Sequence, residues 1–172
     1  MSRRGFLIAL PAGIGIAACS GGSTSALEAD EQGASSNSTP VNKWRAMSED
    51  DWRERLSDEA FRVLRKEGTE RAFTSPLNEE KREGLYHCAG CDLPLFSSET
   101  KYESGTGWPS FWKPLKDAVD TKPDHKLFVT RTEYHCRRCG GHQGHVFDDG
   151  PKPTGQRWCN NGVALTFRPA KS

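Results

Sequence analysis

The chain lacks a marked excess of either charge and, after its N-terminus, any long apolar run. Its 172 residues contain 24 Lys and Arg against 23 Asp and Glu. A nucleic-acid-binding domain would carry a basic excess, so this balance argues against a nucleic-acid partner. After residue 18 we find no second apolar stretch long enough to cross a membrane as a helix. The sequence also lacks the alternation of helix and strand patterns that a parallel sheet requires.

The first 18 residues resemble an export signal. Arg3 and Arg4 precede a short apolar stretch over residues 6–18, and the paired arginines resemble the twin-arginine signal of bacteria. Residues 16–19, with the sequence IAAC, resemble a lipobox, in which Cys19 is lipidated and becomes the mature N-terminus. We therefore expect an exported protein of the periplasm or cell envelope, anchored to a membrane by lipid. The alternative is an ordinary signal peptide with an incidental cysteine.

The segment from Cys19 to residue 40 is rich in Ser, Gly, Ala and Thr and poor in large apolar side chains. Such a segment cannot bury enough apolar surface to offset the entropy of ordering, so it is expected to be a flexible tether. The folded domain is then expected over residues 41–172.

Two short helices should begin this domain, because Ser48 and Ser57 each stand before acidic residues that favour a helix N-terminus. The later sequence has frequent glycines and prolines between short β-type runs, which predicts a mainly β domain with many turns. The expected strands cover residues 85–87, 127–132, 133–135, 145–147 and 163–168.

Four of the cysteines form two C-x-x-C pairs, each within a Y-H-C-x-x-C phrase. Cys88 and Cys91 make the first pair, and Cys136 and Cys139 make the second. Four thiolates form a soft, closed shell for Zn²⁺ with no open position, which predicts a structural zinc ion. Two disulfides are the alternative in an exported protein, although a C-x-x-C disulfide closes too small a loop to stabilise much.

Cys159 has no partner in the sequence, and its neighbours are polar. Most lone cysteines are buried as small hydrophobic residues, but the flanking arginine, tryptophan and asparagines do not fit that role. Upstream, His142 and His145 stand three residues apart, and an imidazole can lower a thiol pKa or supply a proton. Cys159 is therefore a candidate nucleophile, unless the two histidines only fill the core or surface.

Five motifs together resemble the type B methionine sulfoxide reductases, in order and spacing, from about residue 52 to residue 167. These motifs are C-x-x-C at 88–91, SGTGWPSF at 104–111, C-x-x-C at 136–139, GHVFDDGP at 144–151 and RWC-x-N at 157–161.

The resemblance implies two antiparallel sheets, a zinc site away from the active centre, and reduction of methionine-R-sulfoxide, free or within proteins. It implies that the thiolate attacks the sulfoxide sulfur and becomes a sulfenic acid, while the histidines bind or protonate the sulfoxide oxygen. An aromatic pocket would receive the methyl group. The implied residues are Cys159 as the nucleophile, His142 and His145 as the histidines, and Trp108, Phe147 and Asn161 around the substrate.

One departure from the family changes the expected catalytic cycle. Thr106 stands where many members have a resolving cysteine. The sulfenic acid on Cys159 would then need an external thiol, either a thioredoxin-like protein or a small thiol. Two other classes remain open from the residues alone: a non-catalytic zinc-ribbon interaction module, and a cysteine–histidine hydrolase, for which no acidic or amide partner is recognisable.

Overall fold

The computed structural model describes residues 40–126 and 129–171, so the predicted signal, Cys19 and nearly all of the predicted tether lie outside the described residues. Three short α-helices precede the strands: α1 (Pro40–Arg45), α2 (Glu49–Arg55) and α3 (Asp58–Lys66). Three 3-10 turns lie further along the chain: η1 (Pro76–Asn78), η2 (Ser98–Thr100) and η3 (Gly162–Ala164). None of the helices in this part of the chain is long and apolar enough to span a bilayer.

The starts of α2 and α3 confirm the predicted caps. The Ser48 side chain accepts a hydrogen bond from the backbone of Asp51, whose carboxylate accepts one from the Ser48 backbone in return. Ser57 caps α3 through its side chain, which accepts a hydrogen bond from the backbone of Ala60. The capped α3 then packs its apolar face on β7 and η3, and so contributes to the wall behind the later strands.

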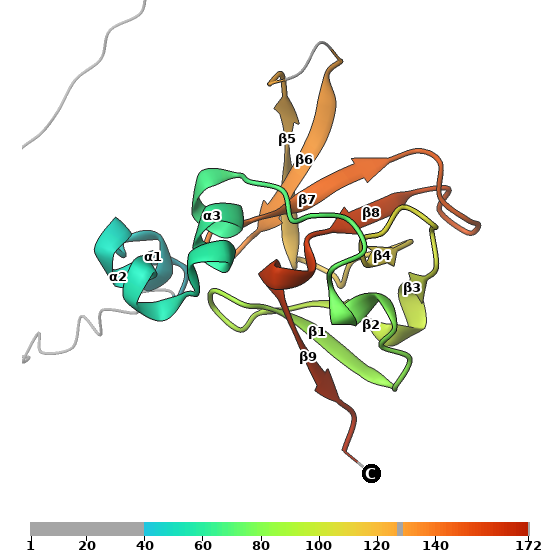
Figure 1. Cartoon of the computed structure of the whole chain (residues 1–172), viewed down its shortest axis with the longest axis horizontal. Coiled ribbons are helices and arrows are strands. Elements are labelled where there is room, and N and C mark those ends of the chain that lie inside the picture. Colours follow the sequence, from blue (N-terminus) through green and yellow to red (C-terminus); the bar gives the residue numbers. More distant parts are fainter. Residues whose placement is uncertain (1–39, 127–128, 172) are drawn as a thin grey trace, which may run out of the picture. The chain divides into compact units, whose positions relative to one another are not determined.

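Two antiparallel sheets make up the rest, as predicted (Figure 1). The smaller sheet has the order β2-β1-β9, and the larger has the order β3-β4-β8-β7-β6-β5. The bounds in the smaller sheet are β1 (Gly84–Cys88), β2 (Pro94–Ser97) and β9 (Leu165–Pro169). Those in the larger are β3 (Lys101–Tyr102), β4 (Ser110–Phe111), β5 (Val119–Asp124), β6 (Arg131–Cys136), β7 (His142–Phe147) and β8 (Arg157–Asn160).

Aromatic side chains from both sheets form the centre of the core. Phe96 of the smaller sheet stacks on Phe111 of the larger, with ring centroids 4.2 Å apart. Tyr86 meets Phe111 edge-on at 4.9 Å, and Tyr134 meets Trp158 edge-on at 5.0 Å. Such pairs contribute roughly 0.5–1.5 kcal/mol each beyond their area of burial. This packing fixes β4, β6 and β8 relative to the smaller sheet.

Several predicted strand bounds were wrong. Residues 129–130 lie outside any strand and β6 begins only at Arg131, while residues 127 and 128 of the predicted strand lie outside the described residues. Val163 belongs to η3, and β9 begins at Leu165. Strands β2, β3, β4, β5 and β8 were not predicted. β5 contains Pro123, which a central strand would exclude, but β5 lies at the edge of its sheet, where proline is tolerated.

Candidate active site and metal centre

The four paired cysteines meet in one buried cluster. Cys88 ends β1 and Cys136 ends β6, and the turn after each strand supplies Cys91 and Cys139. All four sulfurs lie within 4.8 Å of one another, with the Cys88–Cys139 pair at 3.6 Å and the Cys91–Cys136 pair at 3.5 Å. Tetrahedral ligands with metal–sulfur bonds of about 2.3 Å would have edges of about 3.8 Å. The cluster therefore has the dimensions and donor set of a four-thiolate metal site, and its thiols are free rather than paired in disulfides.

Hydrogen-bond donors surround this cluster. The side-chain amide of Gln143 donates to the sulfur of Cys88 at 3.4 Å, and the backbone N–H of Gly141 donates to the sulfur of Cys139 at 3.4 Å. Donors of this kind stabilise thiolate over thiol, as metal binding requires. Arg65 of α3 also donates a hydrogen bond to the Cys139 carbonyl at 3.1 Å, which connects α3 to the second cysteine turn.

Cys159 lies apart from the cluster, on β8 in the middle of the larger sheet. It is paired with Ser110 of β4 on one side and with His145 of β7 on the other. Directly opposite residues of an antiparallel pair have Cβ atoms about 4.5–5.5 Å apart, so His145 is a cross-strand neighbour of the thiol. Gly144 permits the close approach of the two strands, because a Cβ there would lie 1.9 Å from the Cys159 carbonyl oxygen.

A β-bulge places the two histidines on one face of β7. Residues three apart on a regular strand would face opposite sides of the sheet. Here the register shifts between Tyr134 and His135 of β6, and Gln143 is left as an extra residue on β7. The ring centroids of His142 and His145 therefore lie only 5.5 Å apart. Bulges commonly redirect side chains in this manner beside functional sites.

A cavity of about 100 Å³ opens beside the thiol. The cavity is small, and both aromatic and polar side chains line it. Its lining residues are Thr69, Trp108, Arg131, Gly144, His145, Phe147, Cys159, Asn160 and Asn161.

His145 is held by a carboxylate from the edge of the sheet. Its Nε2 lies 2.8 Å from Asp124 Oδ2, and the same oxygen accepts a hydrogen bond from Arg131 at 2.7 Å. Backbone, histidine and arginine hydrogen bonds keep the pKa of Asp124 well below its usual range, so this carboxylate is ionised at neutral pH. Burial lowers the pKa of His145, and the Asp124 hydrogen bond opposes that shift in part. With Nε2–H donating to Asp124, the Nδ1 atom of a neutral His145 remains a proton acceptor.

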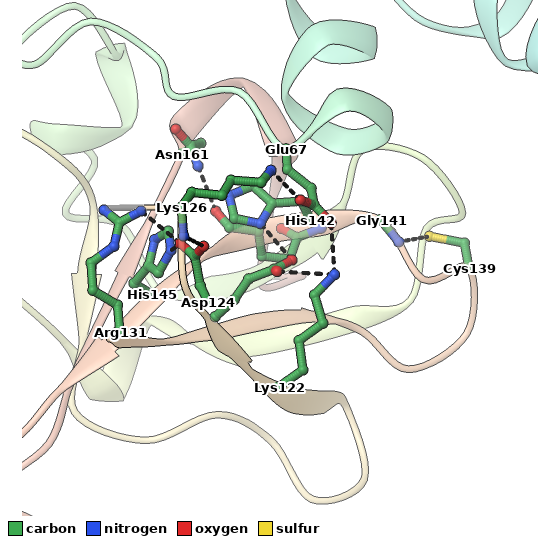
Figure 2. A network of polar contacts seen from close by, with 12 residues as sticks. Glu67, Lys122, Asp124, Lys126, Arg131, Cys139, Gly141, His142, His145 and Asn161 are labelled. Atoms are coloured by element: carbon green, nitrogen blue, oxygen red, sulfur yellow. Dashed lines mark hydrogen bonds and ion pairs between the residues drawn. The ribbon is translucent and has the colours of Figure 1, made fainter. Parts of the chain in front are cut away.

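His142 belongs to a second, more deeply buried network, which Figure 2 shows beside the first. Its Nδ1 lies 2.8 Å from Glu133 Oε1, and both side chains are almost completely buried. The other Glu133 oxygen lies 3.1 Å from Lys122, which also binds Glu67 at 2.6 Å. Lys126 pairs with Glu67 as well. The end of α3 is thereby tied to β5 and, through Glu133, to the orientation of His142.

The surroundings of the thiol act on its ionisation in opposite directions. Burial raises the pKa of Cys159, while the Arg157 guanidinium and the Thr106 hydroxyl lower it without cancelling the increase. Arg157 is held by a two-point contact with Asp149 at 2.8 and 2.9 Å, and it stacks over the Phe147 ring at 4.2 Å. The neutral thiol is thus favoured at rest, with a fixed positive charge close by.

Backbone contacts position the two remaining predicted residues. The indole N–H of Trp108 donates to the carbonyl of Glu70 at 3.0 Å. Asn161 uses both ends of its amide, accepting from the Glu70 N–H at 2.8 Å and donating to the Gln143 carbonyl at 2.9 Å. Asn161 therefore joins the segment after α3 to β7 while one side of it lines the cavity.

The structure brings most of the predicted site residues to one cavity: Cys159, His145, Trp108, Phe147 and Asn161. His142 meets His145 edge-on but does not line the cavity. Sequence reasoning missed Asp124, Glu133 and Arg131, which form no motif with the histidines. Recognition of β5 as a strand that pairs with β6 would have helped, because this pairing sets Asp124 opposite Arg131.

Asp124 also provides the acidic partner that a cysteine–histidine hydrolase would need, so the geometry fits two classes of reaction. The comparisons with known proteins decide between them. A model of the SelR domain matches residues 56–169. The chain is 52% identical over 129 residues to the peptide methionine sulfoxide reductase MsrB of Leptospira interrogans, an alignment that covers 74% of this chain and 95% of the relative.

Proteins of the same name in two other organisms are similar to this chain over comparable lengths. The identity is 50% over 133 residues for Agrobacterium fabrum, covering 77% of this chain and 96% of the relative. It is 53% over 121 residues for Methanosarcina mazei, covering 70% and 86%. The chain therefore belongs to the MsrB family of peptide methionine sulfoxide reductases and is an oxidoreductase.

Proposed function

We propose that this protein reduces the R epimer of methionine sulfoxide, with Cys159 as the nucleophile. The observation that carries the proposal is the cavity beside Cys159, which has Trp108 and Phe147 as aromatic lining and His145 as a polar one. The sulfoxide sulfur bears a methyl group, an oxygen and a chain in a fixed handedness. An aromatic wall for the methyl and a proton donor for the oxygen can accept only one handedness with the sulfur facing the thiol.

The proton path is proposed to run from Cys159 through His145. The resting thiol holds its proton, because burial raises its pKa. Nδ1 of His145 takes this proton, and the ionised Asp124 stabilises the resulting imidazolium. The thiolate then attacks the sulfoxide sulfur while His145 protonates the oxygen. The oxygen is transferred to the cysteine sulfur, so methionine leaves reduced and Cys159 becomes a sulfenic acid.

His142 is proposed to order water beside the sulfoxide oxygen. Glu133 occupies its Nδ1, and its buried Nε2 has no hydrogen-bond partner among the described residues. A neutral His142 with Nδ1–H bound to Glu133 would leave Nε2 free to accept a hydrogen bond from such a water.

The central experiment is reduction of separated R and S epimers by the full chain with dithiothreitol. We expect turnover of the R epimer alone, and we expect Cys159→Ser to abolish it with the metal content unchanged. Equal turnover of both epimers would remove the stereochemical part of the proposal. Substantial activity in Cys159→Ser would remove the nucleophile.

The sulfenic acid is proposed to be reduced by an external thiol. Thr106, with its hydroxyl beside the Cys159 sulfur, takes the place of the family's resolving cysteine. A thioredoxin-like protein or small thiol would form a mixed disulfide with Cys159, releasing water, and a second thiol would release the enzyme. A thioredoxin that lacks its second cysteine should therefore capture a 1:1 adduct at Cys159. An internal disulfide to Cys159 in oxidised wild type would contradict this route.

Zinc is proposed as the metal of the four-cysteine cluster, in a structural role. Buried thiolates at tetrahedral spacing suit Zn²⁺, and a closed sulfur shell leaves no position for substrate. Elemental analysis should give one zinc per chain. A metal-free protein with both C-x-x-C pairs in disulfides would contradict the proposal.

The N-terminal segment is proposed to export the protein and to anchor it by a diacylated Cys19 in the cell envelope. The support comes from the sequence of residues 1–19 alone. Two acyl chains bind a membrane far more firmly than one. Fractionation and mass spectrometry of wild type and Cys19→Ala test this, since a soluble, unlipidated wild-type protein would exclude the anchor.

A further inference from the structure

Phe73 is an exposed aromatic residue beside the candidate active site. Three large hydrophobic side chains are exposed among the described residues: Phe73 at 74%, Leu85 at 37% and Val129 at 71%. Phe73 differs from the other two in its backbone, which has a φ of 65°. A side chain with a Cβ rarely adopts this left-handed conformation, so the surrounding contacts must enforce it.

Those contacts join Phe73 to the loop that carries the pocket tryptophan. The N–H of Phe73 donates to the Gly107 carbonyl at 2.7 Å, and the Asn78 side chain donates to the same carbonyl at 3.1 Å. The Phe73 ring lies against Gly107, since a Cβ there would be 2.8–2.9 Å from three of its atoms. The next residue, Trp108, lines the cavity and binds the Glu70 carbonyl. The ring is therefore fixed at the rim of the site, with most of its surface facing solvent.

The cavity is small, with a volume of about 100 Å³, so it can hold a methionine sulfoxide side chain but not the neighbouring residues of a peptide. The backbone of a bound peptide and its neighbouring side chains must therefore remain outside, at the rim. A rigid aromatic ring at that place would gain free energy by covering apolar neighbours, at little entropic cost.

We propose that Phe73 binds apolar side chains that flank methionine sulfoxide in a protein substrate, so that sulfoxides in apolar segments are preferred over those with small or polar neighbours. The inference rests on the proposed function and adds to it a preference for particular flanking residues. Oxidation makes buried methionines polar and exposes the apolar segments around them, which gives the ring suitable partners.

The test compares three R-sulfoxide substrates in the full-length, metal-containing protein: N-acetyl-methionine sulfoxide amide, a peptide with leucine on both sides of the sulfoxide, and one with glycine on both sides. Wild type should prefer the leucine peptide. Phe73→Ala should lower kcat/KM for that peptide roughly tenfold, which corresponds to about 1.4 kcal/mol. It should change kcat/KM for the other two substrates by no more than about twofold, because they bury little of the ring. Phe73→Tyr retains the ring and should retain the preference.

Leu85→Ala is the matched control, since Leu85 is also exposed but lies on β1 of the smaller sheet. It should change none of the three values. If Phe73→Ala lowers kcat/KM equally for all three substrates, the ring only supports the loop that carries Trp108, and the proposal is overturned. If it changes none, the ring binds no substrate. Failure of wild type to reduce any R-sulfoxide would instead refute the proposed function itself.

Discussion

Replacing Glu133 should test whether burial or the number of partners decides how much an ion pair contributes to the free energy of unfolding of this protein. Glu133 has two partners, His142 at 2.8 Å and Lys122 at 3.1 Å, and its side chain is 4% exposed. Glu49 also has two partners, Arg53 at 2.9 Å and Lys66 at 2.6 Å, but its side chain is 50% exposed. The two glutamates therefore form a matched pair that differs mainly in burial.

In Glu133→Ala the buried Nδ1–H of His142 loses its acceptor, which costs about 1–3 kcal/mol. Lys122 is half exposed and keeps its ion pair with Glu67, so the loss of its contact with Glu133 adds little to the destabilisation. Removal of a buried carboxylate returns part of its own desolvation cost. We expect a net loss of about 2 kcal/mol, which corresponds to a decrease in melting temperature of roughly 6–10 °C for a domain of this size. Glu49→Ala should leave the melting temperature almost unchanged, because solvent screens that pair.

The same substitution should lower activity, because Glu133 sets the orientation and tautomer of His142. We expect kcat/KM for an R-sulfoxide to decrease roughly tenfold in Glu133→Ala and less in Glu133→Gln, whose amide oxygen can still accept from Nδ1. Thermal unfolding and dithiothreitol-driven turnover measure both effects. Equal melting temperatures for Glu133→Ala and Glu49→Ala would refute the reasoning from burial.

Four further outcomes are expected for variants of the cysteine cluster and of Asp124. Cys88→Ser, or a strong chelator, should unfold the domain, because structural zinc contributes about 10 kcal/mol or more; unchanged circular dichroism would contradict this. Gln143→Leu should weaken metal affinity about tenfold in a competition titration, since it removes the donor to Cys88; equal affinity would show that this donor is dispensable. Asp124→Asn should lower the pKa of His145 further and shift the acidic limb of the pH–activity profile to lower pH. Because the pKa of Asp124 is depressed, its stabilisation is present above about pH 4 and is lost as the pH falls below that value; the same pH dependence of stability in wild type and Asp124→Asn would contradict that assignment.

The features that could be predicted from the sequence are those encoded by neighbouring residues. Helix caps depend on residues three apart, and Ser48 and Ser57 fulfil the expected roles. A C-x-x-C turn presents two sulfurs by local geometry, so the repeated phrase was enough to predict a four-thiolate cluster. The two-sheet arrangement came from the family resemblance, since short runs between glycines do not specify which strands pair.

The partners of the histidines could not be predicted, because they come from other strands, whose pairing with β7 the sequence does not specify. Asp124 and Glu133 lie 21 and 9 residues from their histidines, at no recurring spacing. Asp124 meets His145 only because β5, β6 and β7 are adjacent in the sheet. The residues alone counted against a hydrolase because no acidic partner was recognisable, whereas the structure shows that Asp124 is such a partner for His145.

The β-bulge at Gln143 was equally invisible in the sequence, yet both sites depend on it. A regular strand with histidines at positions 142 and 145 would send one of them away from Cys159. The extra residue of the bulge shifts the alternation of side chains along β7 by one position. The ring centroids of His142 and His145 therefore lie 5.5 Å apart. The same residue extends its own side chain to the sulfur of Cys88, while its backbone carbonyl receives the Asn161 amide. Gln143 therefore links the four-cysteine cluster to the wall of the cavity beside Cys159, although none of the four cysteines lines that cavity.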